Sequence, residues 1–379
     1  MNILILNSNP KCLGTRTLVK AGEAKGHKMV VSDPSYFSPL VSDVTSGHDR
    51  LYDLLPKNTS RIQINQIDCI IPRISSNLIY NSYVLEHLSE NLGIYSTQSA
   101  IGLRTAANKF HTIQICSRHG IRTPLTVYSK SSNNIDFLIE KVGGIPFIIK
   151  YNSGSQGAGV MLMETRKSAI SSIQGLMKNR ADFILQEFIE SKNQDIRAIV
   201  CGDRVISAMI RTGPKSDFRS NISLGGSGRP IELSAEDQNI CIRASKAVGL
   251  AFSGVDLLKD KKGTTYLSEI NGNPGSQIIK VTGSNMFSHL IEYIENREVF
   301  GKTAPAKSQD HYYNQLKNEN RKIWGQLKFF TENRQVQHIY KNTKDREIKY
   351  RDVSGKWMLR KIRSPYDIYR IIFDTFLIK

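Results

Sequence analysis

Short apolar strands alternate with amphipathic helices over residues 1–95, and this alternation restricts the fold more than any other feature of the chain. The pattern predicts strands at residues 2–7, 29–34 and 68–74, and helices at residues 15–26 and 81–93. Such alternation favours a parallel, Rossmann-like sheet, because a helical crossover joins one parallel strand to the next. No Gly-x-Gly-x-x-Gly sequence follows the first strand, so no dinucleotide site is predicted there.

From about residue 97 the order of elements changes. The pattern predicts a long helix at 99–120, a helix at 134–144, and strands at 124–129, 146–151, 159–165 and 183–189, with a further helix before the last strand. Two hairpins follow at 195–212 and 252–271, with a helix at 235–249 between them, and a Gly-Asp pair forms the first turn. A chain of 379 residues is too long for one minimal core, so we expect an α/β protein of two or three lobes.

Positive charge is concentrated in the last fifth of the chain. The formal net charge is +18, and residues 301–379 hold 18 Lys and Arg against 8 Asp and Glu. Strands are predicted at 334–342, 346–353 and 356–362 and a helix at 364–377, with aromatic residues between the cations (Tyr340, Lys349, Tyr350, Arg351, Trp357 and Arg360). Three interpretations stay open: packing on the rest of the protein or on a second copy, binding of an acidic peptide, or binding of nucleic acid.

The cysteine content and the N-terminus indicate a location. Five cysteines are scattered without a Cys-x-x-Cys pair, which argues against a disulfide framework or a zinc site and predicts a reducing cytoplasm. No window approaches the roughly 18 apolar residues of a membrane span. The N-terminus has no basic segment before its apolar run, so we expect a first strand and no signal peptide.

A glycine-rich loop follows a strand that ends at Lys150. Gly154, Gly157 and Gly159 allow the backbone to approach a ligand closely and to point N–H groups at it, which suits a polyphosphate. Lys150 at the base of the loop can add a positive charge. The alternative is a flexible hairpin tip without a ligand.

The hairpin at 252–271 carries oxygen-bearing side chains on one face. Glu269 and Asn271 are two residues apart on a strand and therefore share a face. Two registers of the hairpin, which place Asp256 opposite Leu267 or opposite Glu269, both bring it to that face. Two carboxylates and an amide oxygen form a hard-oxygen site of the kind that Mg²⁺ prefers when it shares nucleotide phosphates. The alternative is a set of solvated acidic residues at a strand end.

Together these motifs resemble the ATP-grasp superfamily, and in particular its RimK-type α-L-glutamate ligases and related amino-acid ligases. The resemblance covers about residues 1–296 and includes, in the family's order, IPRIS, GGIPFIIK, GSQGAGV, LQEFI, DIRAIVCGDRVISAMIR, DFRSN, GVDLL and EINGNPG. It implies a pre-ATP-grasp domain at 1–96, a small ATP-grasp lobe at 97–184, a C-terminal lobe at 185–300 and a basic α+β extension at 301–379.

The resemblance also implies roles for individual residues. Lys109 and Lys150 match phosphate-contacting lysines, with Lys150 also expected to act in catalysis. The 153–159 loop, with Ser155, Gln156, Gly157 and Gly159, matches a lid over the phosphates. Glu187 and Phe188 match the segment that holds adenine, and Asp195 matches a ribose contact. Arg219, Ser220 and Asn221 match further nucleotide contacts. Asp256, Glu269 and Asn271 match the metal ligands. Arg211 is the expected electrophilic partner of the transferred phosphoryl group.

The implied reaction joins a carboxylate to an amine and consumes ATP. One or two Mg²⁺ (or Mn²⁺) ions, with two expected, would assist attack of a carboxylate on the γ-phosphorus, and the amine would then displace phosphate from the acyl phosphate. We expect an amino-acid donor, a protein or peptide acceptor and a homo-oligomer. The alternative function is a nucleic-acid or ribosome-associated binding module. The turn Gly272-Asn273-Pro274-Gly275 departs from the family's usual Ser-Ser-Pro-Gly, which puts contacts to the acceptor in doubt.

Overall fold

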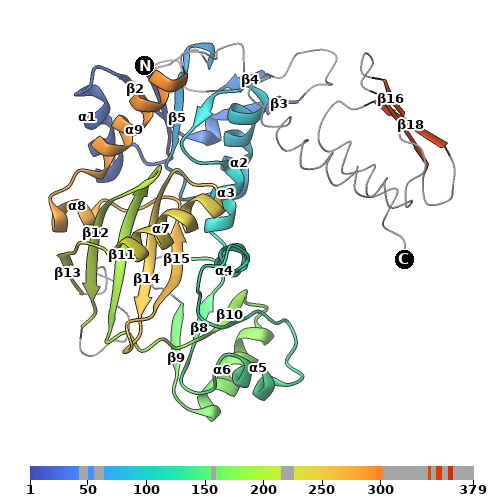
Figure 1. Ribbon diagram of the computed structural model, residues 1–379, viewed down its shortest axis with the longest axis vertical. Helices are drawn as coiled ribbons and strands as arrows, with labels where there is room; N and C mark the ends of the chain where they lie inside the picture. The colour runs from blue at the N-terminus through green and yellow to red at the C-terminus, as the bar shows by residue number, and fades with distance from the viewer. Residues whose placement is uncertain are drawn as a thin grey trace. The chain divides into compact units, whose positions relative to one another are not determined.

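The N-terminal sheet is parallel, as the strand–helix alternation predicts. In the computed structural model its strand order is β2 (Lys28–Ser32), β1 (Asn2–Leu6), β5 (Cys69–Pro72) and β6 (Tyr95–Ser96), and all neighbours pair in parallel (Figure 1). Four of the five β1 residues are buried, because a parallel strand covered on both faces has no solvent side. The Rossmann-like part of the fold prediction is therefore confirmed.

The structure describes residues 1–41, 50–54, 64–154, 159–214, 226–301, 340–342, 347–351 and 357–361. The chain divides into a first unit, Met1–Glu298, and a second unit, Val299–Lys379. Among the described residues, no helix is both long and apolar enough to cross a membrane.

Helices α1 and α2 belong to the N-terminal part of the first unit. Helix α1 (Leu13–Glu23) follows β1, and α2 (Leu78–Glu86) continues into a π-helical turn (His87–Asn91). Short 3-10 turns lie at Pro34–Tyr36 and Ile64–Gln66. Strands β3 (Phe37–Leu40) and β4 (Arg50–Asp53) form a separate antiparallel pair that the sequence pattern does not reveal.

The single helix predicted at 99–120 is wrong, because the structure has two helices there. Helix α3 (Ala100–Ala106) ends before Asn108, and α4 (Lys109–Arg118) begins directly after it. The Asn108 side chain accepts a hydrogen bond from the His111 N–H and caps the new helix. The break places Lys109 in the first turn of α4, where its N–H donates to the Asn152 carbonyl at 2.9 Å.

The second sheet of the first unit is antiparallel. Its order is β7 (Thr126–Val127), β10 (Phe183–Glu187), β8 (Phe147–Tyr151) and β9 (Val160–Met163). Helices α5 (Ile135–Lys141) and α6 (Arg166–Lys178) contribute Ile139 and Ile173 to a core with alternate residues of β8 and β10. The opposite face of β8 carries Lys150.

The third sheet has five antiparallel strands and positions most of the candidate site. Its order is β13 (Ser227–Pro230), β12 (Arg204–Thr212), β11 (Gln194–Cys201), β14 (Phe252–Lys259) and β15 (Thr265–Asn271). Helix α7 (Ala235–Val248) packs on β11, β12, β14 and β15 and ends at Gly249. Helices α8 (Gln277–Thr282) and α9 (Met286–Gly301) follow the sheet.

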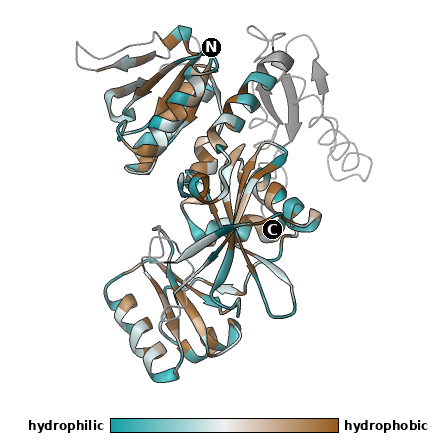
Figure 2. Cartoon of the chain, turned by 90° about the vertical axis from the view of Figure 1, so that its left-hand side faces the viewer, coloured by the Kyte–Doolittle hydropathy of each residue, from teal (hydrophilic) through white to brown (hydrophobic). Residues whose placement is uncertain are grey.

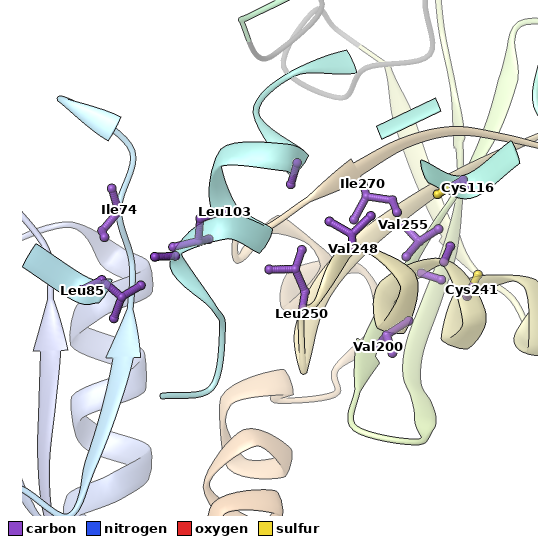
Figure 3. Close-up of a cluster of buried hydrophobic side chains, with 14 of the residues drawn as sticks. Ile74, Leu85, Leu103, Cys116, Val200, Cys241, Val248, Leu250, Val255 and Ile270 are labelled. Carbon is purple, nitrogen blue, oxygen red and sulfur yellow. The ribbon is translucent and has the colours of Figure 1, made fainter. Parts of the chain in front are cut away.

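A continuous apolar core joins the N-terminal sheet to the third sheet. Figure 3 shows Leu103 of α3 between Ile74 and Leu85 on one side and Leu250 and Ile270 on the other. Figure 2 shows apolar residues concentrated in the strands, with hydrophilic residues at many turns. The two sheets are therefore parts of one packed body within the first unit.

The described part of the second unit is a three-stranded antiparallel sheet. Strands β16 (Tyr340–Asn342), β17 (Glu347–Arg351) and β18 (Trp357–Lys361) pair in chain order. They lie within the three segments predicted as strands, so this meander is confirmed. The helix predicted at 364–377 lies outside the described residues.

Asp237 at the start of α7 binds side chains of both strands of the β14–β15 hairpin. Its buried carboxylate accepts hydrogen bonds from Lys259 Nζ and Thr265 Oγ1, each at 2.7 Å. Burial raises the pKa of Asp237, but hydrogen bonds from Lys259, Thr265 and Ser234 outweigh burial, so the pKa lies below its ordinary value. The carboxylate therefore stabilises the fold above pH ~4, and this contribution is lost as the pH falls through the lowered pKa.

We expect Asp237→Asn to lower the free energy of unfolding at pH 7 by about 2 kcal/mol, the usual value of a charged hydrogen-bond group. The difference from the wild type should begin to shrink below pH ~4 and should vanish below the lowered pKa, where the wild-type carboxylate also becomes neutral. Urea unfolding at several pH values measures this. The matched control is Asp203→Asn, because Asp203 forms an exposed ion pair with Lys246. An equal effect of the two substitutions would contradict the prediction.

Candidate active site

The hairpin of β14 and β15 contains an irregularity that brings its two carboxylates together. Leu257 pairs with Leu267, but the next residue, Asp256, pairs with Glu269, so Ser268 is the additional residue of a β-bulge. In a regular ladder Asp256 would face Ser268, and Glu269 would point to the opposite face. The bulge therefore places Asp256, Glu269 and Asn271 on one face of the third sheet.

Two arginines contact Asp256, one from the neighbouring strand β11 and one from the next strand, β12. Arg197 on β11 lies opposite Asp256 and donates through Nε to Oδ1 and through Nη2 to Oδ2, the latter at 2.7 Å. Arg211 Nη2 on β12 lies 3.0 Å from Asp256 Oδ2. Burial raises the pKa of Asp256, but the charges of Arg197 and Arg211 outweigh burial, so the pKa lies below its ordinary value. Asp256 is therefore a carboxylate at neutral pH.

Asp195 orients Arg211. Its two carboxylate oxygens accept from Nε and Nη2 of Arg211 at 2.7 and 2.6 Å, and both side chains are buried. Burial lowers the pKa of Arg211, but the charges of Asp256 and Asp195 raise it by more. The pKa therefore lies above its ordinary value, and the guanidinium stays charged. The result is one network across three strands, in which Arg211 contacts both Asp195 and Asp256 and Arg197 also contacts Asp256.

Two lysines from outside the third sheet approach the same face. Lys109 Nζ donates to the Gly154 carbonyl at 2.9 Å and lies 4.0 Å from Glu269 Oε1. Lys150 Nζ lies 3.5 Å from Ser268 Oγ. Burial lowers the pKa of Lys150 below its ordinary value, although the charge of Glu269 favours the cation. The face therefore carries four cations and three carboxylates, and its net positive charge favours an anionic ligand. The cations are Lys109, Lys150, Arg197 and Arg211, and the carboxylates are Asp195, Asp256 and Glu269.

Glu187 lies at the other end of the second sheet from Lys150. Lys150 pairs with Ile184 and Phe147 pairs with Glu187, so the two positions are three residues apart, or about 10 Å along the strands, and Glu187 shares the core face of Phe147 while Lys150 is on the opposite face. The Glu187 carboxylate accepts from the Leu125 N–H at 3.0 Å. Phe188 follows directly and is partly buried.

The glycine-rich loop is described only at its two ends. Gly159 has φ +77°, and a Cβ there would lie 2.0 Å from a ring carbon of Tyr151, so only glycine fits. Six predicted nucleotide contacts lie outside the described residues: Ser155, Gln156, Gly157, Arg219, Ser220 and Asn221.

The turn after Asn271 is fixed by residues far away in the sequence. Asn271 Oδ1 accepts from the Asn273 N–H at 3.0 Å, Gln98 Nε2 donates to the Gly272 carbonyl, and Arg73 Nη1 donates to the Pro274 carbonyl at 3.1 Å. A Cβ on Gly272 would lie 2.7 Å from Leu103 Cδ2. Packing against α3 thus explains glycine at this departure from the family pattern.

The oxygen-bearing residues fit a magnesium ion. No group of three or more His, Cys, Asp and Glu side chains among the described residues is placed to hold a metal. The candidate set instead has two carboxylates, of Asp256 and Glu269, and the amide oxygen of Asn271. Mg²⁺ commonly takes one or two carboxylates and completes its shell with water and phosphate oxygens, so this donor set is sufficient. Both oxygens of Asp256 accept from Arg197, so a metal ion at Asp256 would share this carboxylate with the guanidinium groups.

Sequence reasoning missed Arg197 and Ser268. Arg197 lies two residues after Asp195 on the same strand, so the two-residue period of a strand could have placed it on the site's face. Ser268 gives no such signal, because the position of a bulge depends on the partner strand.

Comparison with solved structures gives the class of fold. The ATP-grasp ligase PsnB, in a complex with a minimal precursor, matches 78% of this chain and 98% of its own with a TM-score of 0.60 at 18% identity. The macrocyclase MdnC of Microcystis aeruginosa, bound to a precursor peptide, matches 78% of this chain and 100% of its own with a TM-score of 0.59 at 14% identity. At this identity the likeness shows the fold, and the predicted ATP-grasp fold is confirmed.

Sequence comparison gives the family. Residues 1–103 match the RimK PreATP-grasp domain, and residues 106–294 match the RimK-like ATP-grasp domain. A protein of Shewanella amazonensis named "Probable alpha-L-glutamate ligase 2" is 36% identical over 313 residues, which are 82% of this chain and 99% of that protein. A protein of Trichodesmium erythraeum named "Probable alpha-L-glutamate ligase" is 35% identical over 297 residues, 78% of this chain and 96% of that protein.

This chain belongs to the RimK-like ATP-grasp family. It is an ATP-dependent ligase, and ATP and Mg²⁺ are the cofactors typical of its fold.

Proposed function

We propose that this ligase adds glutamate, or another amino acid, through its amine to a carboxylate of a protein or peptide acceptor. The observation that carries the proposal is the shared face of Asp256, Glu269 and Asn271, with Lys109 4.0 Å from Glu269. Oxygen ligands beside cations suit a metal-bound polyphosphate. The names of the 36% identical relatives and the peptide complexes of PsnB and MdnC support an amino acid and a peptide as the two substrates.

The proposed nucleotide site extends from Lys150 to Glu187. Lys109 and Lys150 bind the phosphates at one end of β8 and β10, and Glu187 and Phe188 contact adenine at the other. The separation of about 10 Å along the strands suits a nucleotide that lies between Lys150 and the main chain of Glu187, whose side chain is on the other face of the sheet. We also propose that Gly159 and the neighbouring loop cover the phosphates.

The reaction proceeds in two steps that balance. An acceptor carboxylate oxygen attacks the γ-phosphorus, the bond to the β-phosphate oxygen breaks, and ADP leaves. The amine of the amino acid then attacks the acyl carbon, loses a proton and displaces inorganic phosphate. Arg211, held by Asp195, stabilises the transferred phosphoryl group, and Lys150 neutralises phosphate charge.

Asp256, Glu269 and Asn271 hold the metal in this proposal. When bound, Mg²⁺ would neutralise phosphate charge. Two ions, and Mn²⁺ as a substitute, stay predictions. A cytoplasmic location, a homo-oligomer and the domain boundaries at residues 96, 184 and 300 are proposals from the sequence.

The basic residues 301–379 are proposed to contact an acidic acceptor. Their net positive charge and aromatic residues support this function, but they also suit nucleic acid. RNA binding that collapses with salt, without ligation, would favour the alternative of a binding module.

The proposed function predicts a strict requirement for four components. Purified protein should release ADP and phosphate only with Mg²⁺, ATP, an acceptor and an amino acid together. Incubation with cell extract and each amino acid, followed by mass spectrometry, should find an acceptor heavier by one or more amino-acid residues. ATP hydrolysis at the same rate without acceptor and amino acid would overturn the proposal.

A further inference from the structure

Arg73 is a buried cation without a counter-charge in the described part of the chain. The residue is 6% exposed, and its guanidinium lies 5.3 Å from the centre of the Phe287 ring. Nη1 donates to the Pro274 carbonyl at 3.1 Å, whereas Nε has no partner. No described Asp or Glu forms an ion pair with it. Burial lowers the pKa of Arg73 to about 10, so it stays cationic at neutral pH.

A buried charge without a partner is costly, because the loss of hydration is not compensated. The candidate site on the third sheet does not include Arg73. An anionic ligand at this guanidinium would remove the cost.

The surroundings of Arg73 also favour an anion. Arg73 directly follows β5, and β5 is the neighbour of β1, after which α1 begins. Arg73 Nη2 lies 3.3 Å from the position of a Cβ on Gly14, in the first turn of α1. The N-terminus of an α-helix carries positive partial charge and N–H groups that bind anions. Ligands of open α/β sheets commonly bind at this carboxyl end of the parallel strands.

The same place is connected to the proposed reaction centre. Pro274, which accepts the hydrogen bond of Arg73, is three residues after Asn271, and Ser276 Oγ lies 3.7 Å from the same Cβ position on Gly14. The buried Oδ1 of Asn273, in the same turn, has no hydrogen-bond partner. A substrate held by Arg73 would therefore be adjacent to the turn that begins at the proposed metal site.

We propose that Arg73 and the first turn of α1 bind a carboxylate of the amino-acid substrate. The inference rests on the proposed function. An amino acid that reacts through its amine keeps its carboxylate unreacted, so that group needs a binding partner outside the phosphate site. Arg73 is a binding residue for this group, and it sets a preference for substrates with a free carboxylate.

Kinetics with matched substrates test this inference. In the wild type, the amide of one carboxylate of the accepted amino acid should raise KM by about 10- to 100-fold, as expected for a lost charged hydrogen bond. For glutamate, the 1-amide and the 5-amide show which carboxylate is bound. Arg73→Met should raise KM for the amino acid by a similar factor and remove the discrimination against that amide, with the KM for ATP changed by less than about twofold. Arg73→Lys should recover part of the affinity.

The matched control is Arg104→Met. Arg104 is also partly buried, but it pairs with Glu86 at 2.9 Å and lies over the Tyr83 ring. Its removal should leave the KM for the amino acid unchanged.

Cys12 gives a test in the unmodified protein. It precedes α1, is partly exposed, and its thiol lies 3.1 Å from Thr15 Oγ1. Burial raises the pKa of Cys12, but hydrogen bonds with Thr15 and the charge of Arg73 outweigh burial, so the pKa lies below its ordinary value. The other four cysteines are buried. Iodoacetamide should therefore alkylate Cys12 first, and the amino acid at ten times its Kd should slow this alkylation about tenfold.

The outcomes separate the two proposals. No amide-forming turnover by the wild type with any amino acid overturns the proposed function and this inference with it. Turnover with an unchanged amino-acid KM in both Arg73 variants, or Cys12 alkylation that the amino acid does not slow, overturns this inference alone.

Discussion

Glu269→Gln is expected to lower kcat for ADP release by about 10³-fold, the scale of losing an electrostatic group aimed at the transition state. The substitution keeps the shape of the side chain but removes the negative charge with which Glu269 would hold a metal ion. Its effect on folding should be below about 1 kcal/mol, because the Lys109 pair at 4.0 Å is partly exposed. Coupled-enzyme detection of ADP, together with thermal unfolding, separates these effects.

Glu190→Gln is the matched control for this variant. Glu190 forms an exposed ion pair with Lys261 and has no role in the proposed site. It should retain wild-type turnover. Near-normal activity of Glu269→Gln would disprove the assignment of Glu269 as a metal ligand, and partial rescue by higher Mg²⁺ would support it.

Arg211→Met is expected to lower the free energy of unfolding by about 3–5 kcal/mol, as for other buried charges that lose their partner. Among the described residues, both oxygens of Asp195 accept from Arg211 alone, so the substitution leaves a buried carboxylate without this partner. Asp256 loses one contact but keeps Arg197. Urea denaturation measures the change.

A double-mutant cycle isolates the interaction. Asp195→Asn combined with Arg211→Met removes both charges, so the pair should be destabilised by at least about 1 kcal/mol less than the sum of the single effects. Additive effects, or a cost below about 1 kcal/mol for Arg211→Met alone, would show that the network contributes little to folding.

Most regular elements follow from local sequence. Alternating or successive apolar residues in the sequence predict β1, β5, β8 and the two long hairpins, because strand periodicity depends on neighbouring residues. The helix predicted at 99–120 fails for a local reason that the sequence does contain: Asn108 can cap a new helix. The pair of β3 and β4 was not predicted, because its strands are short and their sequence lacks a distinctive pattern.

The candidate site is less completely determined by local patterns. The motifs select Lys109, Lys150, Asp256, Glu269 and Asn271, and the structure places these residues at one face. Their functional roles, like those of Glu187 and Phe188, are proposals that the experiments above address. Arg197 and Arg73 become visible only when their partners are known.

The sequence by itself determined the family, the ATP-grasp fold and the choice of carboxylates and cations, because these depend on residue type and order along the chain. The tertiary structure alone decided that Ser268 forms a bulge, that Arg197 and Arg211 both reach Asp256, and that Arg73 is buried beside α1 without a carboxylate partner among the described residues. The physical reason is the same for each. Register, desolvation and ion pairing depend on groups that come from distant parts of the sequence, and only packing fixes which groups meet.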